Sequence, residues 1–367
     1  MGSDVILVIV VGAALAFDFT NGFHDTANAV ATSISTRAMS PRLAVALASL
    51  LNFAGAFISL EVAATIAKGI VTPGAVTETI VFAGLVGAIT WNLITWYFGL
   101  PSSSSHALIG GVVGATFVAV GAGAIEGEGI LQKVVVPAFI APLLAFVCAA
   151  IAITIAYRIV GRLHPGPVNR GYRLGQLVSG ALFSLSHGTN DAQKTMGIIT
   201  LALVAHGDIS ADHFEVPTWV VVSAATAIAL GTYSGGWRII KTMGSRIIKM
   251  DPAQGFAAQG SGAAVVLSAS HFGYPLSTTQ VISGAVMGAG AAKRLSAVRW
   301  GVAGNIMLAW ALTLPASALI GAATYGLTRI FGTGALGPLL VSVSILGVIA
   351  AAFAKRLQRG SPLTAEV

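Results

Sequence analysis

Long runs of apolar residues follow one another along the whole chain, separated by short polar segments. A transmembrane helix needs about 20 mostly apolar residues. Runs that can cross a membrane, alone or as part of a hairpin, lie near residues 5–35, 43–67, 79–98, 107–123, 134–157, 174–205, 219–236, 263–292, 300–327 and 336–353. This pattern predicts an all-α integral membrane protein that crosses the membrane several times.

Two of these runs carry polar side chains in their middle. The run at 5–35 contains NGFHDTANA at residues 21–29, and the run at 174–205 contains HGTNDAQK at residues 187–194. Charged side chains at membrane depth are costly and usually face the protein interior or a watery cavity. Because irregular backbone is tolerated where it lines such a cavity, we expect broken helices, with breaks at residues 18–25 and 186–194.

The composition fits this class of protein. Hydrophobic residues make up 55% and charged residues 9% of the 367-residue chain, whereas a soluble domain carries about 25% charged residues. The net charge of +7 comes mostly from short loops. We therefore assign it to membrane topology and to contact with anionic membrane lipid, and we expect no nucleic-acid partner.

Charged loops predict the orientation of the helices, since cytoplasmic loops carry an excess of Lys and Arg. We place four basic clusters in the cytoplasm: Arg158, Arg162, Arg170 and Arg173; Arg238, Lys241, Arg246 and Lys249; Lys293, Arg294 and Arg299; and Lys355, Arg356 and Arg359. Acidic residues gather in other segments, which we place outside: Glu126, Glu128, Asp208, Asp212 and Glu215. The number of membrane crossings agrees with this placement of the loops only if residues 98–115 and 272–289 form re-entrant hairpins, the first entering from outside and the second from inside.

The two halves of the chain resemble each other. The segment FGLPSSSSH at 98–106 aligns on FGYPLSTTQ at 272–280, 174 positions later, and Asp25 aligns on Asp191, 166 positions later. Two inverted-topology repeats are typical of secondary transporters whose site lies at the repeat interface. We therefore divide the chain into a first inverted repeat with a membrane hairpin (1–160), a cytoplasmic joint (161–173) and a second inverted repeat with a membrane hairpin (174–367).

The hydroxyl-rich loops are the candidate anion site. Each follows a proline and opens an apolar, helix-forming segment, and a helix N-terminus with free N–H groups attracts anions. The candidate substrate ligands are Ser103, Ser104, Ser105, Ser277, Thr278, Thr279 and Gln280. Ser and Thr at these positions can also simply cap the helices, and the sequence leaves both interpretations open for any single hydroxyl.

The acidic segments are the candidate site for a coupling ion. An ionised carboxylate repels an anion, so Asp25 and Asp191 are placed to hold a cation or a proton. Neutral oxygens come from Asn28, Asn190 and Gln193 in the same segments. Imidazoles that titrate near neutral pH come from His24, His106 and His187, either as proton carriers or as hydrogen-bond partners. Lys194 stands where the first half has Asn28, and its ammonium can balance Asp191.

Several segments resemble the Pit family of inorganic phosphate transporters: GFHDTANAVATSISTRAMSP, WNLITWYFGLPSSSSHALIGG, SHGTNDAQK and GYPLSTTQ. The resemblance covers nearly the whole chain, and the first motif is similar to the bacterial low-affinity branch. It implies a multi-pass protein of the inner (plasma) membrane that imports phosphate with protons, in some cases as a neutral metal–phosphate complex, and with sodium in other branches. A homodimer is a further expectation.

The resemblance also implies a sodium alternative. Sodium-coupled relatives tend to carry Asn-Asp followed by Ala/Ser-Asn in both halves, so Asp25, Asn28, Asn190 and Asp191 are the candidate sodium ligands. Here His24 precedes Asp25, and Lys194 replaces the second Asn. This departure favours proton coupling.

Three other functions compete with phosphate transport. The same machinery can carry another oxyanion such as sulfate, although an acceptor near the anion favours phosphate, which also donates hydrogen bonds. A channel is disfavoured by the predicted hairpins. A hydrolase built on Ser105 or His106 lacks a supporting base, and the chain has no HExxH motif. We expect no enzymatic activity and no cofactor.

Overall fold

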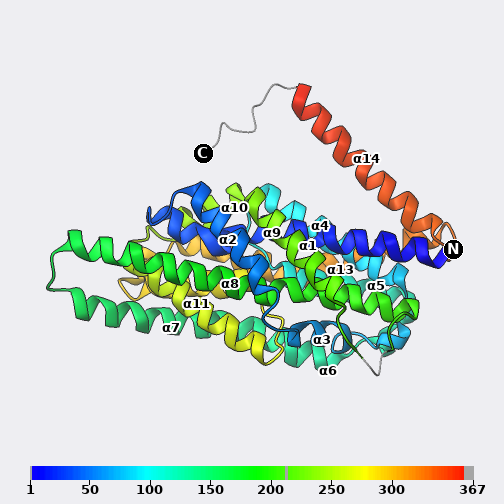
Figure 1. The fold of residues 1–367 in the computed structure, drawn as a ribbon, viewed down its shortest axis with the longest axis horizontal. Coiled ribbons are helices and arrows are strands. Elements are labelled where there is room, and N and C mark those ends of the chain that lie inside the picture. The colour runs from blue at the N-terminus through cyan, green and yellow to red at the C-terminus, as the bar shows by residue number, and fades with distance from the viewer. Residues whose placement is uncertain (1, 211–213, 359–367) are drawn as a thin grey trace.

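The computed structural model describes residues 2–210 and 214–358, with side chains as far as residue 348. Nearly all of this chain is helical, and the long helices run along the longest axis of the molecule (Figure 1). In chain order they are α1 (Gly2–Ser35), α2 (Pro41–Gly55), α3 (Glu61–Lys68), α4 (Glu78–Phe98), α5 (Ser104–Val120), α6 (Gly127–Ile130), α7 (Val136–Val160), α8 (Pro165–His206), α9 (Thr218–Ser234), α10 (Trp237–Lys241), α11 (Pro252–His271), α12 (Thr278–Ala291), α13 (Trp300–Arg329) and α14 (Leu336–Gln358).

The described residues contain no strand longer than one isolated bridge, between Val71 and Ile125. The all-α class is therefore confirmed. Four helices are long and apolar enough to span a membrane, five if the bent pair of α9 with residues 237–246 is counted, and three further apolar helices are shorter. Of the predicted charges, Asp212, Arg359 and the side chains of Lys355 and Arg356 lie outside this description.

The predicted breaks in the two long polar runs are wrong. Helices α1 and α8 continue without interruption through residues 18–25 and 186–194. They pack against each other in the middle of the bundle, so their polar side chains face protein rather than lipid. Because a continuous helix satisfies its own backbone hydrogen bonds, the buried polar side chains require no irregular backbone.

Helical hairpins occur at both predicted positions, and their re-entrant placement in a membrane stays a prediction. One joins α4 to α5 through residues 99–103, and the other joins α11 to α12 through residues 272–277. Each turn begins near a glycine in the left-handed region, Gly99 with φ 66° and Gly273 with φ 73°, where other residues are strained. The hydroxyl of Ser105 donates to the carbonyl of Leu276 at 3.0 Å, so the tips of the two hairpins touch.

The hairpins pack in the same way against different helices. Gly110 and Gly114 bring α5 against the backbone of α13, and Gly284 and Gly288, their repeat counterparts, bring α12 against the backbone of α7. A Cβ atom at any of the four would overlap backbone or hydroxyl atoms of the neighbouring helix. This duplicated packing fits two structural repeats, whereas their opposite orientation in a membrane stays a prediction.

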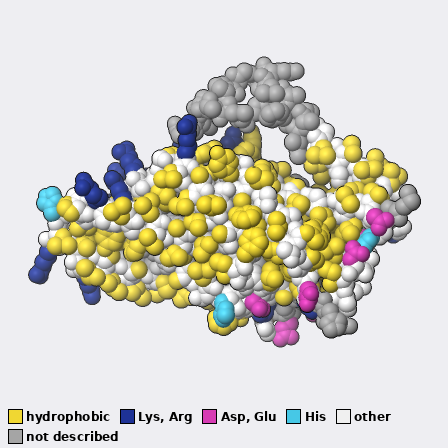
Figure 2. Space-filling view, in the orientation of Figure 1, with side chains coloured by type: hydrophobic (Ala, Val, Ile, Leu, Met, Phe, Trp, Pro, Cys, Tyr) yellow, Lys and Arg dark blue, Asp and Glu magenta, His cyan; other side chains and the backbone are white. Residues whose placement is uncertain are grey.

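The surface separates by charge along the long axis. On the face shown in Figure 2, Lys and Arg side chains gather at one end, Asp and Glu side chains lie toward the other, and the surface between them is mostly apolar. On α7, the exposed row of Leu143, Val147, Ile151 and Ile155 lies opposite a row of buried alanines. Contiguous exposed apolar surface of this kind is typical of a protein that meets a membrane.

The glycine contacts give a test of the packing. Gly288→Ala should lower the thermal unfolding temperature, because the added methyl overlaps the carbonyl oxygen of Phe146 and overpacking costs about 1–3 kcal/mol. Gly304→Ala is the matched control, since nothing lies within 4 Å of a Cβ there. Intrinsic fluorescence during heating in detergent measures both, and equal midpoints for the two variants would contradict the close approach of α12 to α7.

Candidate functional site

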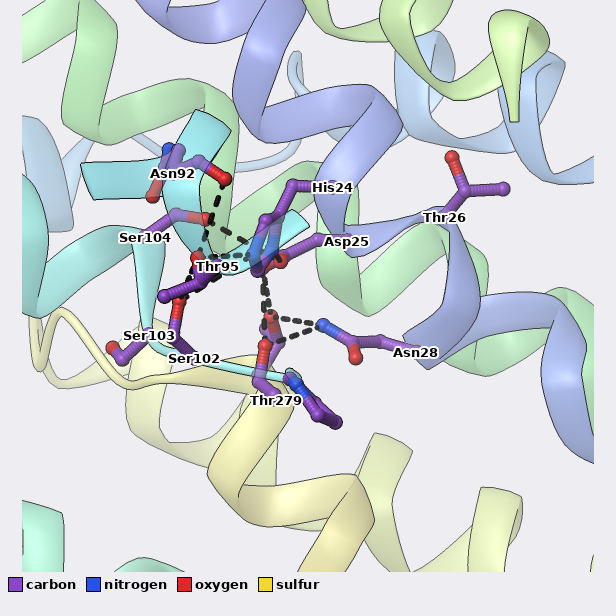
Figure 3. Close-up of polar contacts among 12 residues, drawn as sticks. His24, Asp25, Thr26, Asn28, Asn92, Thr95, Ser102, Ser103, Ser104 and Thr279 are labelled. Atoms are coloured by element: carbon purple, nitrogen blue, oxygen red, sulfur yellow. Dashed lines mark hydrogen bonds and ion pairs between the residues drawn. The ribbon is translucent and has the colours of Figure 1, made fainter. Parts of the chain in front are cut away.

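Two buried carboxylates lie at the centre of the bundle, Asp25 on α1 and Asp191 on α8, with 3% and 1% of their surfaces exposed. Figure 3 shows the surroundings of Asp25, where side chains of α1, α4 and both hairpins converge. Nδ1 of His24 lies 2.6 Å from Oδ1 of Asp25. Hydroxyls of Ser104 and Thr279 donate to Asp25 at 3.4 and 3.3 Å, so both hairpins contact this carboxylate.

The carboxylate of Asp191 is surrounded by groups of opposite or convertible charge. The ammonium of Lys194, one helix turn farther along α8, forms a buried ion pair with it. Nε2 of His187 lies 3.1 Å from Oδ2 of Asp191 and 4.0 Å from Oδ2 of Asp25, so this imidazole stands between the two carboxylates. The hydroxyl of Thr278 donates to Asp191 at 3.2 Å. Both hairpins and both long helices therefore meet at one centre.

The contacts of the two halves correspond position by position. Ser104 contacts Asp25 just as its repeat counterpart Thr278 contacts Asp191. Asn28 donates to Thr279 at 2.9 Å. Its counterpart Lys194 donates at 2.5 Å to Ser105, the counterpart of Thr279, and at 2.8 Å to the carbonyl of Leu276. Each long helix thus contacts the hairpin of its own half through a carboxylate and the hairpin of the other half through a nitrogen donor.

Two of the predicted hydroxyls are helix caps. Ser103 accepts from the N–H of His106 at 3.1 Å, and Ser277 accepts from the N–H of Gln280 at 3.3 Å. A serine before the first helical residue satisfies an N–H group that has no partner within the helix. The capping interpretation is thus confirmed for this pair. The hydroxyls that contact the carboxylates are those of Ser104, Thr278 and Thr279, whereas Ser105 contacts Lys194 and the carbonyl of Leu276.

Gln193 lies beside the centre but is engaged elsewhere. Its side-chain oxygen accepts from the N–H groups of Val62 and Ala63 at 2.8 and 3.3 Å, and its amide donates to the carbonyl of Thr189. These contacts hold the N-terminus of α3. The apolar run at 43–67, which was predicted as one segment, forms two helices, α2 and α3.

Sequence reasoning missed the groups that hold the two histidines. Nε2 of His24 lies 3.1 Å from the hydroxyl of Thr95 on α4, which in turn contacts Ser102 at 2.8 Å. Nδ1 of His187 lies 3.2 Å from Oδ1 of Asn52 on α2. Single polar residues within apolar runs were the available signal, since Thr95 and Asn52 both interrupt otherwise apolar helices and are buried.

The centre offers ligands for a cation. One donor atom each from Asp25, His187 and Asp191 lies within 4.8 Å of the others. Within the described part of the chain, the side-chain oxygens of Asn28 and Asn190 have no hydrogen-bond partner. The amide of Asn190 is held by Ser270 at 2.8 Å, which fixes the direction of its free oxygen. Asp25 and Asp191, two of the predicted ion ligands, therefore contribute carboxylate oxygens here, beside the ammonium of Lys194.

The side chains of the centre are buried from solvent. The exposed fractions of Ser104, Thr278, Thr279 and Lys194 are all 2% or lower. A small anion can accept from the hydroxyls of the hairpins and from the ammonium, while a proton or metal cation can bind the carboxylates. Such an arrangement can hold an anion and a cation together, and ligand entry requires the helices to move.

Comparison with known proteins agrees with this geometry. Residues 21–321 match the model of the phosphate transporter family. The chain is 55% identical over 327 residues to a Mycobacterium tuberculosis protein described as a "Probable low-affinity inorganic phosphate transporter", covering 89% of this chain and 78% of that protein. It is 46% identical over 323 residues to a Bacillus subtilis protein of the same description, covering 88% and 96% of the two chains.

A solved structure shares the fold. It is described as "The sodium-dependent phosphate transporter", and it superposes with a TM-score of 0.80 at 26% sequence identity, covering 89% of this chain and 99% of that one. The relatives are named as transporters, which is a non-enzymatic function. With its apolar helices and this match over most of its length, the chain is a multi-pass membrane protein that belongs to the phosphate transporter family.

Proposed function

We propose that this chain imports inorganic phosphate across the plasma membrane together with protons, by alternating access. The observation that carries the proposal is the meeting of two hairpin tips at a pair of buried carboxylates, one of which is paired with Lys194. Phosphate would accept hydrogen bonds from Ser104, Thr278 and the neighbouring hydroxyls. The carboxylates would bind the cation that travels with it.

Charge explains why transport of the anion needs a cation. The two carboxylates, when ionised, outnumber the one ammonium at the centre. Like charges 4 Å apart repel by roughly 4 kcal/mol at an effective dielectric constant of 20. Phosphate therefore binds well only after a proton or another cation lowers the negative charge. This requirement couples the two movements without any further device.

Lys194 favours the proton over sodium. Its ammonium contacts Asp191, Ser105 and the carbonyl of Leu276, and Asp191 is one of the ligands that a sodium ion in the second half would use. A fixed positive charge also repels a metal cation. In the first half the neutral amide of Asn28 takes the corresponding place.

Two alternatives use the same centre. The free oxygens of Asn28 and Asn190 and the sodium-dependent description of the solved relative support sodium coupling. The cluster of Asp25, His187 and Asp191 would also hold a divalent metal that travels as a neutral metal–phosphate complex. We expect sulfate to bind more weakly than phosphate, because sulfate has no proton to donate to these carboxylates at neutral pH.

Burial of the centre in this conformation supports alternating access over a channel. The repeats would then be residues 1–160 and 174–367, joined at 161–173. Residues 359–367 of the second repeat lie outside the described chain. The exposed apolar row on α7 supports contact with membrane lipid, and the homodimer stays a prediction.

The carboxylates give the first functional prediction. Asp25→Asn and Asp191→Asn should each abolish accumulation of labelled phosphate in proteoliposomes, because each removes a group that binds the coupling charge. Glu128→Gln, in an exposed segment, is the control and should accumulate phosphate as the parental protein does. Accumulation at the parental rate by either aspartate variant would remove that residue from the coupling role.

The hairpins should act as one site. Ser104 and Thr278 belong to different hairpins, yet both donate to Asp25, at 3.4 and 3.5 Å. Ser104→Ala and Thr278→Ala should each weaken phosphate binding by about 1 kcal/mol. In the double variant the losses should deviate from additivity by about 0.5 kcal/mol or more. Calorimetric titration with phosphate measures all four proteins, and additive losses would place the hydroxyls at separate sites.

Lys194 gives the sharpest test of the coupling ion. Lys194→Asn restores the residue type that the first half carries at Asn28, so uptake by this variant should gain a dependence on sodium. The parental protein should respond to an inward proton gradient and be indifferent to sodium. Lys241→Gln, which removes an exposed cation, should behave as the parental protein. Sodium-driven uptake by the parental protein would return Asp25, Asn28, Asn190 and Asp191 to the role of sodium ligands.

A further inference from the structure

One face of α1 carries a row of polar residues that begins before the site already described. Asp18, Asn21, Asp25 and Asn28 recur at intervals of three and four residues, which places them on one side of a helix. Asp25 and Asn28 contact the hairpins. Asp18 lies seven residues earlier, about 10 Å from Asp25 along the helix axis at 1.5 Å per residue.

We propose that Asp18, in addition to Asp25 and Asp191, takes up a coupling proton and releases it on the other side of the membrane. The proposal rests on proton-coupled phosphate transport and adds a third carboxyl group that carries a proton. In one cycle the carboxylate binds a proton from the outer solution, phosphate binds at the hairpin tips, and both are released inside, which restores the carboxylate.

The first argument is the isolation of Asp18. Its side chain is fully buried, and within the described part of the chain neither carboxylate oxygen has a partner in good hydrogen-bond geometry, although Asn21 and Thr195 lie close by. Burying an unpaired ionised carboxylate is very costly, whereas its protonated form loses far less on leaving water. Asp25 and Asp191, in contrast, each have a histidine and hydroxyls in contact. Protonation therefore relieves a large desolvation penalty at Asp18.

The neighbours of Asp18 suit both protonation states. They are Asn21 on the same helix and Thr195 on α8, and their side-chain oxygen and nitrogen atoms are also buried without partners. A hydroxyl and an amide can donate to a carboxylate, and their oxygens can accept from a carboxylic acid. The same two side chains can therefore satisfy the group before and after it binds a proton. This property is required of a reversible proton carrier.

The surrounding charges connect Asp18 to the anion site. Asp191 and Lys194 of α8 act on it electrostatically from the adjacent turns. The other titratable side chains near the centre are His24 and Asp25 on α1, His187 on α8 and His106 on α5. Helices α4 and α9, which also pack against α1, carry titratable side chains only near their ends: Glu78, Tyr97 and Tyr233. Neutralising Asp18 therefore lowers the negative charge that opposes phosphate binding.

The position of Asp18 also suits proton entry. It lies on the N-terminal side of Asp25, and the N-terminus of α1 is at the end of the molecule opposite the loop that joins α7 to α8 (Figure 1). That loop carries part of the basic cluster from Arg158 to Arg173, which we place in the cytoplasm. Asp18 is thus on the predicted outer side of the phosphate site, where a proton arriving from outside would meet it first.

The test compares Asp18→Asn with the parental protein in proteoliposomes. The neutral amide imitates the protonated acid, so exchange of labelled for unlabelled phosphate at equal pH should continue at a rate similar to the parental one. Accumulation in response to an inward proton gradient should be lost. With the membrane potential clamped, a gradient of one pH unit raises the parental accumulation ratio up to about tenfold for each coupled proton. The control is Asp208→Asn, in an exposed segment, which should respond as the parental protein does.

The outcomes separate this assignment from the transport proposal. The assignment of Asp18 to the proton would be overturned if Asp18→Asn accumulated phosphate in response to the proton gradient as the parental protein does. It would also be overturned if the parental protein accumulated phosphate with sodium and Asp18→Asn abolished that accumulation. Loss of exchange in a stably folded Asp18→Asn protein would also overturn it. Absence of phosphate exchange in the parental protein would instead overturn the transport proposal.

A second variant decides the matter if Asp18→Asn fails to reach the membrane. Asp18→Glu keeps an ionisable carboxyl group at this position. It should therefore retain both exchange and the response to the proton gradient, with a shifted dependence of uptake on external pH. Exchange without any response to the gradient in Asp18→Glu would contradict the assignment.

Discussion

Two aspartates buried beside a single lysine constrain the rest of the structure. Removing charges from water costs several kcal/mol per ion even in real proteins, and this cost is offset only by closely placed partners. The partners come from two hairpins and two long helices, because the hydroxyls of Ser104 and Thr278 and the ammonium of Lys194 all reach the carboxylates. The hairpins must therefore meet at their tips, and glycines let α5 and α12 approach α13 and α7 closely enough.

The same constraint supports the proposal of coupled transport. A centre with two carboxylates and one ammonium binds an anion poorly until a cation neutralises part of its charge. The duplicated contacts of the two halves differ in charge where Asn28 faces Thr279 and Lys194 faces Ser105. That difference places a fixed cation in one half and leaves the other half neutral. We propose that this asymmetry selects the proton.

Much of this centre could be predicted from the sequence, because polar residues in apolar runs are rare and their repetition was visible. The hairpins and Asp25, Asp191, Lys194 and the hydroxyl pairs were found in this way. The helix breaks were wrong because sequence does not reveal that α1 and α8 shield each other. Thr95 and Asn52 were missed because each is one polar residue whose partner lies far away in sequence. The use of Gln193 to cap α3 likewise depends on a distant contact.

The most direct test of the shared site is an electron cryomicroscopy map of the protein incubated with saturating phosphate. The account predicts compact density where the hairpin tips meet, within hydrogen-bond distance of Ser104, Thr278 and Lys194 and next to Asp25. The density should be missing from a map recorded without phosphate. Phosphate bound elsewhere, or contacting one hairpin while the other stays apart, would contradict the claim that both hairpins form a single anion site.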